Sequence, residues 1–149
     1  MVECDFPECT TFGSVIRFAL ELEKGAAGVY EELSREPKAA AAAETFRTLA
    51  AAHKKRGELL EFTRQQKLNE MILEPIQDMR RETYIIDTRT PKGVDLKGAA
   101  KFASKIEETS AMFYLDSAKI AKNIMAEAAR IMDKLGKESL ANKAKLEAL

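Results

Sequence analysis

The sequence predicts an all-α fold, a four-helix bundle made of two helical hairpins joined by a long crossover. Apolar residues recur at the three- and four-residue spacing of a helix face. One such stretch, from Val15 to Leu33, is followed by a second copy at 99–117. The 149 residues are 46% hydrophobic and 32% charged, with 7 glycines and 4 prolines. This composition is typical of one compact helical domain, which we expect to span 1–149.

The two copies match position by position and share a glutamate in the middle of the apolar face. The matched pairs are Phe18 with Phe102, Ala19 with Ala103, Leu22 with Ile106, Glu23 with Glu107, and Tyr30 with Tyr114. Burying an unpaired carboxylate costs several kcal/mol even after the protein relaxes around it. Each glutamate therefore needs a metal, a cation or a proton beside it.

The first hairpin consists of helices expected over 11–35 and 38–75. A threonine just before the first helix can cap it, and Glu36-Pro37 ends it, because proline disfavours helical backbone in the residue before it. Pro37 also suits the first turn of the next helix. The second helix begins in the alanine run 39–43, which has high helix propensity, and Pro75 should end or kink it.

A crossover is expected over 76–94, with a short extended piece near Tyr84. Asp95 caps the third helix, expected over 95–119, and the fourth is expected over 125–147. The fourth helix repeats the second after a two-residue insertion: Met132 falls on Phe46, Leu135 on Leu49, Gly136 on Ala50, and Leu146 on Leu60. Two hairpins joined by a long crossover can bury all four apolar faces against one another.

Charge and composition exclude several classes of protein. Lys+Arg and Asp+Glu both number 24, so the balance predicts neither a nucleic-acid partner nor a membrane surface as partner. There is no signal segment and no apolar run long enough for a bilayer, so we expect a cytoplasmic protein. Cys4 and Cys9 are too few for a thiolate metal site and are interpreted as reduced surface thiols, with a local disulfide or a redox role as the alternative.

The glutamate and tyrosine pattern of the two copies, together with Phe46 and Leu49-Ala50 in the second helix, resembles the rubrerythrin branch of the ferritin-like superfamily. The resemblance implies a ferritin-like bundle with a di-iron centre held by two single glutamates and two Glu-x-x-His motifs. Glu23 and Glu107 fall at the single-glutamate positions. The positions of the first Glu-x-x-His motif hold His53 and Arg56 instead.

In the fourth helix, the positions of the second motif hold Ser139 and Asn142. Both Glu-x-x-His motifs are thus absent, as is the rubredoxin-like module of the family. A shifted alignment would offer Glu127 and Arg130 as a damaged motif, but it spoils the apolar match of this helix.

The residues at these positions predict a core polar pocket neutralised by protein cations. Our hypothesis is that Arg56, with help from His53, neutralises the two glutamates where iron would have done so. Ser139 and Asn142 complete the hydrogen bonding. The resemblance places Tyr30 and Tyr114 beside the site, where their hydroxyls can act as further partners. Of the basic run Lys54-Lys55-Arg56, only the arginine is expected to face inward.

Several plainer interpretations stay open at this point. His53 can be a hydrogen-bonded core histidine, the tyrosines ordinary core aromatics, and the glutamates half-exposed at a bundle seam. One iron or manganese ion held by Glu23, His53 and Glu107 is the alternative to a pocket without cofactor. The fixed charge of Arg56 disfavours an ion in the same pocket.

Two main functions follow from these interpretations. The first is a ferritin-like protein that has lost redox chemistry, is not a working di-iron oxidoreductase, and keeps the bundle as a scaffold or interaction module. We expect it to form a homodimer, with Met71, Met79, Tyr84 and Ile85 around the crossover as candidate surface residues. The second is an iron- or manganese-dependent peroxidase or oxidase that works with a reduced ligand set.

Overall fold

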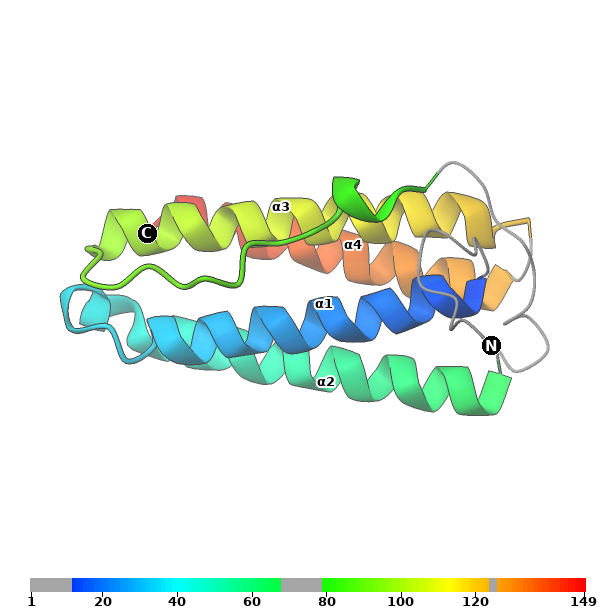
Figure 1. Ribbon diagram of the computed structural model, residues 1–149, viewed down its shortest axis with the longest axis horizontal. Helices are drawn as coiled ribbons and strands as arrows, with labels where there is room; N and C mark the ends of the chain where they lie inside the picture. Colours follow the sequence, from blue (N-terminus) through cyan, green and yellow to red (C-terminus); the bar gives the residue numbers. More distant parts are fainter. Residues whose placement is uncertain (1–11, 68–78, 124–125) are drawn as a thin grey trace.

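The computed structural model describes residues 12–67, 79–123 and 126–149. They form four α-helices, α1 (Phe12–Leu33), α2 (Ala43–Lys67), α3 (Leu96–Ala121) and α4 (Ala126–Glu147). Helices α1 and α2 form one antiparallel pair and α3 and α4 another, and the two pairs lie side by side (Figure 1). The prediction of an all-α chain with four packed helices is therefore confirmed. None of these helices combines the length and apolar character needed to cross a membrane.

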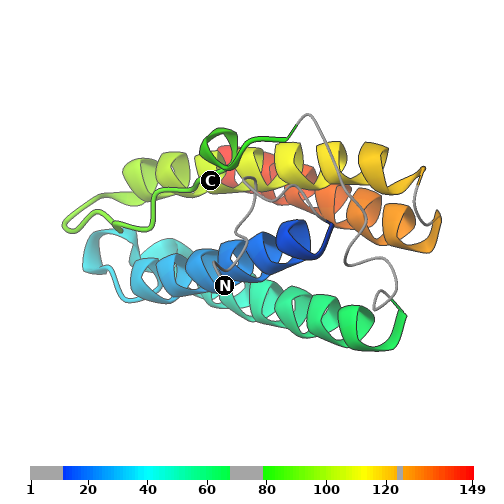
Figure 2. The ribbon, with the colours of Figure 1, turned by 45° about the vertical axis from the view of Figure 1, so that its right-hand side comes forward.

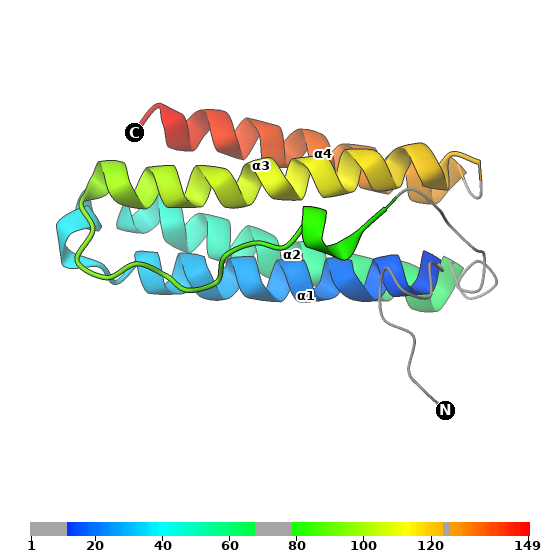
Figure 3. The ribbon, with the colours of Figure 1, turned by 45° about the horizontal axis from the view of Figure 1, so that its top comes forward.

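The described part of the crossover, from Met79 to Asp95, runs along the side of the bundle formed by α1 and α3 (Figure 3). It contains one short 3₁₀ helix, η2 (Arg81–Thr83), and no strand in this part. Because the crossover returns the chain along the length of the bundle, α2 and α3 run in the same direction (Figure 2). A single long connection with this consequence is one of the recurring four-helix topologies.

The crossover is held against the bundle by contacts with both α1 and α3. The Tyr84 hydroxyl donates a 2.7 Å hydrogen bond to Asp116 of α3. The Arg81 guanidinium lies 5.1 Å from the centre of the Phe18 ring of α1. Gly25 of α1 makes room for the chain, since a Cβ there would lie 3.0 Å from the side chain of Thr88.

The crossover residues that we expected at a homodimer surface are mostly buried. Met79 and Tyr84 are only 4% and 3% exposed and pack in the apolar core. Ile85 is 58% exposed, and Met71 lies outside the described residues. The expectation was wrong for Met79 and Tyr84 because the crossover packs its apolar side chains into the seam between the helix pairs.

The helix boundaries differ from the expected ones at the α1–α2 junction. Helix α1 ends at Leu33, and the alanine run forms a 3₁₀ helix, η1 (Pro37–Ala42), so that α2 begins at Ala43 instead of 38. Ala39 has φ −114° and ψ 20°, outside the helical region, so the backbone is kinked within η1 itself. At the other hairpin, Asp95 caps α3 as predicted by accepting a 2.8 Å hydrogen bond from the Gly98 N–H. Pro75 lies outside the described residues.

The core divides into two apolar clusters along the bundle. One cluster contains the first half of α1, the second half of α3 and the first half of α4, and the other contains the opposite halves of α1 and α3 with the start of α2. In α1 the boundary falls between Leu22 and Ala26, and in α3 between Ile106 and Phe113. The conserved spacing of the two repeats thus leaves a layer at mid-bundle that neither apolar cluster fills.

Candidate functional site

The layer between the two apolar clusters is filled by buried polar side chains from all four helices. Glu23 of α1 and Glu107 of α3 are 1% and 0% exposed. His53 and Arg56 of α2 and Ser139 of α4 are also buried. The alternative of half-exposed glutamates at a seam is therefore wrong, and two carboxylates require compensation inside the core.

His53 lies at the centre of the layer and joins the two glutamates. Its Nδ1 is 2.7 Å from Oε2 of Glu23, and its Nε2 is 2.7 Å from Oε2 of Glu107. Both distances are typical of hydrogen bonds to a charged group. A carboxylate only accepts, so both ring nitrogens donate, and an imidazole with two N–H groups is the cation. The geometry therefore fits an imidazolium held between two carboxylates.

The two tyrosines complete the layer in a crossed arrangement. The Tyr30 hydroxyl of α1 donates to Glu107 of α3 at 2.6 Å, and the Tyr114 hydroxyl of α3 donates to Glu23 of α1 at 2.8 Å. The result is a hydrogen-bonded chain that runs Tyr30–Glu107–His53–Glu23–Tyr114. Each tyrosine thus donates to the glutamate of the other helix pair. Sequence spacing alone did not indicate this pairing.

Arg56 contributes a second cation but less directly than the sequence suggested. Its Nη2 donates to the Leu135 carbonyl at 2.7 Å and to the Ser139 hydroxyl at 2.8 Å, both on α4. Its Nε lies 3.6 Å from Oε1 of Glu23, an ion pair without a hydrogen bond. His53, not Arg56, is therefore the principal partner of the carboxylates, because only the short imidazole reaches both of them.

The fourth helix contributes neutral groups to the layer. The Asn142 side-chain N–H donates to Oε1 of Glu107 at 3.2 Å, and Ser139 accepts from Arg56. Glu127 is half-buried and Arg130 exposed near the start of α4, away from these residues. The structure brings together all eight residues of the expected polar pocket, and the unshifted alignment of α4 agrees with this placement. Lys54 and Lys55 are exposed, as expected for the basic run.

The charges of the layer balance without a further ion. Burial lowers the pKa of His53, but the hydrogen bonds to Glu107 and Glu23 and the charges of both carboxylates outweigh this effect and raise that pKa to about 9. Burial raises the pKa of Glu107, but the hydrogen bond and charge of His53 outweigh it and leave this pKa lowered. At neutral pH two carboxylates thus face one imidazolium and one guanidinium, a net charge of zero.

The tyrosines remain protonated donors in this environment. Burial raises the pKa of Tyr30 well above its ordinary value, and the neighbouring charge of Glu107 raises it further. Burial and the charge of Glu23 do the same for the pKa of Tyr114. Each hydroxyl therefore keeps its proton and supplies a permanent donor to one carboxylate.

The donor set does not fit a di-iron centre. Among residues 12–67, 79–123 and 126–149, no group of three or more His, Cys, Asp or Glu side chains is arranged to hold a metal ion. The two ring nitrogens of His53 point to different carboxylates. A single metal ion bound to one of these nitrogens would therefore lie beside only one of the two carboxylates. The oxygens of Glu23 and Glu107 already accept from His53, tyrosine and Asn142. A dication here would also face the fixed charge of Arg56. Cys4 and Cys9 lie outside the described residues.

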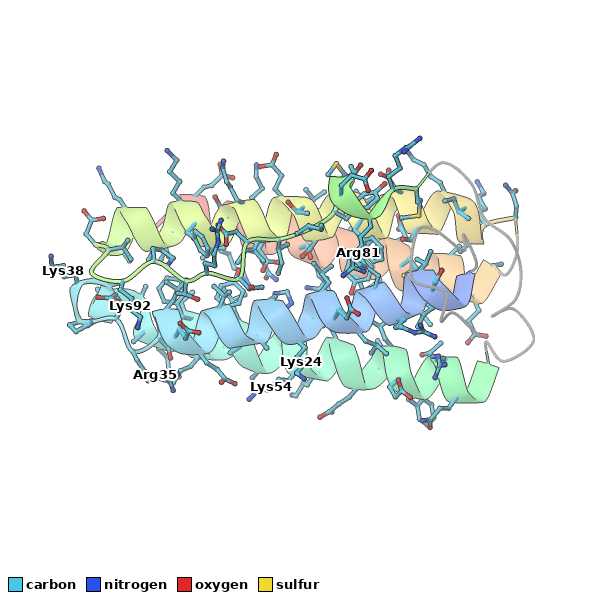
Figure 4. The ribbon with its side chains drawn as sticks, in the orientation of Figure 1. Lys24, Arg35, Lys38, Lys54, Arg81 and Lys92 are labelled. Atoms are coloured by element: carbon cyan, nitrogen blue, oxygen red, sulfur yellow. The ribbon has the colours of Figure 1, made fainter. Side chains whose placement is uncertain are left out.

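A cavity of about 640 Å³ opens between α1 and α2 and reaches the layer from outside. Its lining includes Glu23 and His53. Lys24 of α1 and Lys54 of α2 stand at the same opening (Figure 4), where Lys54 forms an ion pair with Glu31. The sequence reasoning missed this opening, whose only signal was the small residues on the facing helices.

Comparison of the chain with protein-family models, with curated proteins and with solved structures finds no match in any of the three.

Proposed function

We propose that the chain is a ferritin-like bundle of the rubrerythrin type in which an internal ion-pair layer takes the place of the di-iron centre. Such a protein acts as a non-redox helical scaffold or interaction module. The observation that carries the proposal is the position of His53, which occupies both carboxylates at 2.7 Å with its two nitrogens. The protein supplies by itself the positive charge that two buried carboxylates need.

Two further observations support the ferritin-like part of the proposal. One long crossover makes α2 and α3 run in the same direction, as in ferritin-like bundles. The two single glutamates come from α1 and α3 and meet in the centre of the bundle, where that superfamily holds its metals. The chain thus combines the expected topology with a changed set of core residues.

The second candidate is an iron- or manganese-dependent oxidoreductase that uses Glu23, His53 and Glu107. It is favoured by the α1–α2 cavity, whose lining includes Glu23 and His53. Metal binding at this place requires His53 to lose a proton and to leave at least one carboxylate. The two candidates therefore differ in a property that can be measured directly, the metal content.

The test is elemental mass spectrometry on untagged protein that has been exposed to ferrous iron or manganese without oxygen and then desalted. The proposal predicts far less than one metal ion per chain, equally for the wild type, for Glu107→Gln and for the matched variant Glu108→Gln. Glu108 is the exposed neighbour of Glu107. Stoichiometric metal in the wild type and in Glu108→Gln, but not in Glu107→Gln, would overturn the scaffold proposal and favour the metal-dependent candidate.

Self-association as a homo-oligomer is part of the scaffold proposal. The most exposed large apolar side chains of the described residues are Phe62 of α2 and Ile85 of the crossover, at 59% and 58%. We expect sedimentation velocity to give an assembly larger than one chain, and Phe62→Glu or Ile85→Glu to dissociate it. A monomeric wild type at all accessible concentrations contradicts this part.

A further inference from the structure

A second cavity, of about 410 Å³, lies on the opposite side of α2, at its seam with α4. It does not include Glu23, Glu107 or His53. Arg56 lines it together with Lys55 of α2 and with Lys134 and Lys145 of α4. Glu138 is the only acidic residue in the lining.

Positive charges outnumber negative charges around this cavity. Four cations and one carboxylate line it, whereas the whole chain has a formal net charge of zero. Lys134 and Lys145 are about three helical turns apart and so share one face of α4. Within the described ranges, none of the three lysines forms an ion pair with a carboxylate. Such a cluster attracts a multivalent anion, because an anion relieves the repulsion among the cations.

Arg56, which lines this cavity, has hydrogen-bond donors without a partner. The residue is 5% exposed, and its Nη1 is a buried atom without a hydrogen-bond partner. Of its nitrogens only Nη2 forms hydrogen bonds, to the Leu135 carbonyl and the Ser139 hydroxyl. A buried donor without a partner is costly, so the site gains when an acceptor arrives. Guanidinium N–H groups match the geometry of phosphate oxygens.

We propose that the α2–α4 cavity binds a small multivalent oxyanion of the phosphate type, with Arg56 as the inner donor and Lys55, Lys134 and Lys145 around the anion. The volume exceeds that of inorganic phosphate and leaves room for a small organic group, for which Leu59 supplies an apolar wall. The site borders the ion-pair layer and shares Arg56 and Asn142 with it. It goes beyond the scaffold role proposed above and does not depend on metal.

The test is isothermal titration of the full chain with inorganic phosphate, at constant ionic strength set with chloride. We expect saturable binding of one phosphate per chain. Lys134→Gln/Lys145→Gln should weaken it about tenfold. Lys137→Gln/Lys143→Gln is the matched control, since it removes the same charge from the same helix outside the cavity, and it should change the affinity less than about twofold.

Arg56→Lys tests the inner donor, because it keeps the charge but loses the paired N–H groups. Arg56→Lys should also weaken phosphate binding, and circular dichroism tests whether the variant is folded. If Arg56→Lys does not fold, the two double lysine variants alone test the proposal. If titration up to about 10 mM phosphate gives no saturable binding signal, the proposal is wrong. It is also wrong if the two double variants weaken phosphate binding equally, because the lysines would then act only through the net charge of the protein.

Discussion

The stability of the fold should depend on pH through the single histidine. In the native protein the pKa of His53 is raised to about 9, because the hydrogen bonds and charges of Glu107 and Glu23 outweigh the effect of burial. The ordinary value of 6.5 applies when the chain is unfolded. At 1.36 kcal/mol per pKa unit, the difference corresponds to about 3 kcal/mol of folding free energy.

The folded protein binds the His53 proton more tightly than the unfolded chain does. The contribution of His53 to stability is therefore fully present below pH 6.5 and is lost as the pH rises through about 9. Urea denaturation followed by circular dichroism, at pH values from about 6 to about 9.5, measures the free energy of unfolding across this window. We expect it to fall by about 3 kcal/mol on account of His53.

The His53→Gln variant isolates this contribution from other titrating groups. Glutamine cannot bridge both carboxylates as a cation, so the layer keeps two negative charges against Arg56 alone. At pH 7 the variant should lose about 3–5 kcal/mol of stability. The difference in the free energy of unfolding between wild type and variant should shrink as the pH rises to 9. A difference that stays constant with pH would show that His53 is neutral in the core and would refute the reasoning.

Three further predictions concern single contacts. Tyr114→Phe removes a donor from the buried carboxylate of Glu23 and should cost about 1.5–3 kcal/mol in urea denaturation, and an unchanged midpoint would exclude the crossed pairing. Gly136→Ala should destabilise the fold by about 1–3 kcal/mol, since its Cβ would lie 2.8 Å from Leu115. Gly28→Ala has free space around its Cβ and should stabilise the fold by about 1 kcal/mol. Equal effects of the two substitutions in thermal melts would contradict the α3–α4 packing. Tyr84→Phe loses the hydrogen bond to Asp116 and should cost about 1 kcal/mol, with faster amide exchange along the crossover; unchanged exchange would argue against this anchor.

The fold was predictable because its information is local and repeated. The apolar spacing and the matched copies with Glu23 and Glu107 predict four helices in two pairs, and the capping carboxylate of Asp95 is visible in the sequence. The alanine run misled at the start of α2, because high helix propensity says nothing of the kink at Ala39. The crossover could not be read in detail, since burial of Met79 depends on packing from elsewhere in the chain.

The membership of the polar layer was predictable, but its internal order was not. Alignment of the two repeats selects the paired glutamates and tyrosines, because helical periodicity fixes the face on which each lies. The other members were predicted from the resemblance to the rubrerythrin branch, whose motif positions fall on His53, Arg56, Ser139 and Asn142. The partner that each side chain selects depends on reach across the bundle. His53 displaced Arg56 as the central cation, and Tyr30 crosses to Glu107, for reasons of distance that no spacing along one helix contains.

The protonation state of His53 tests the central claim most directly, and the chain is suited to the measurement because it has only one histidine. Nitrogen-15 NMR of metal-free protein at pH 7.5 to 8.5 should show one imidazole with protons on both Nδ1 and Nε2, unchanged when ferrous iron is added without oxygen. Two protonated nitrogens establish the imidazolium between Glu23 and Glu107. A neutral ring that titrates near its ordinary pKa, or a signal that ferrous iron broadens away, would contradict the ion-pair layer.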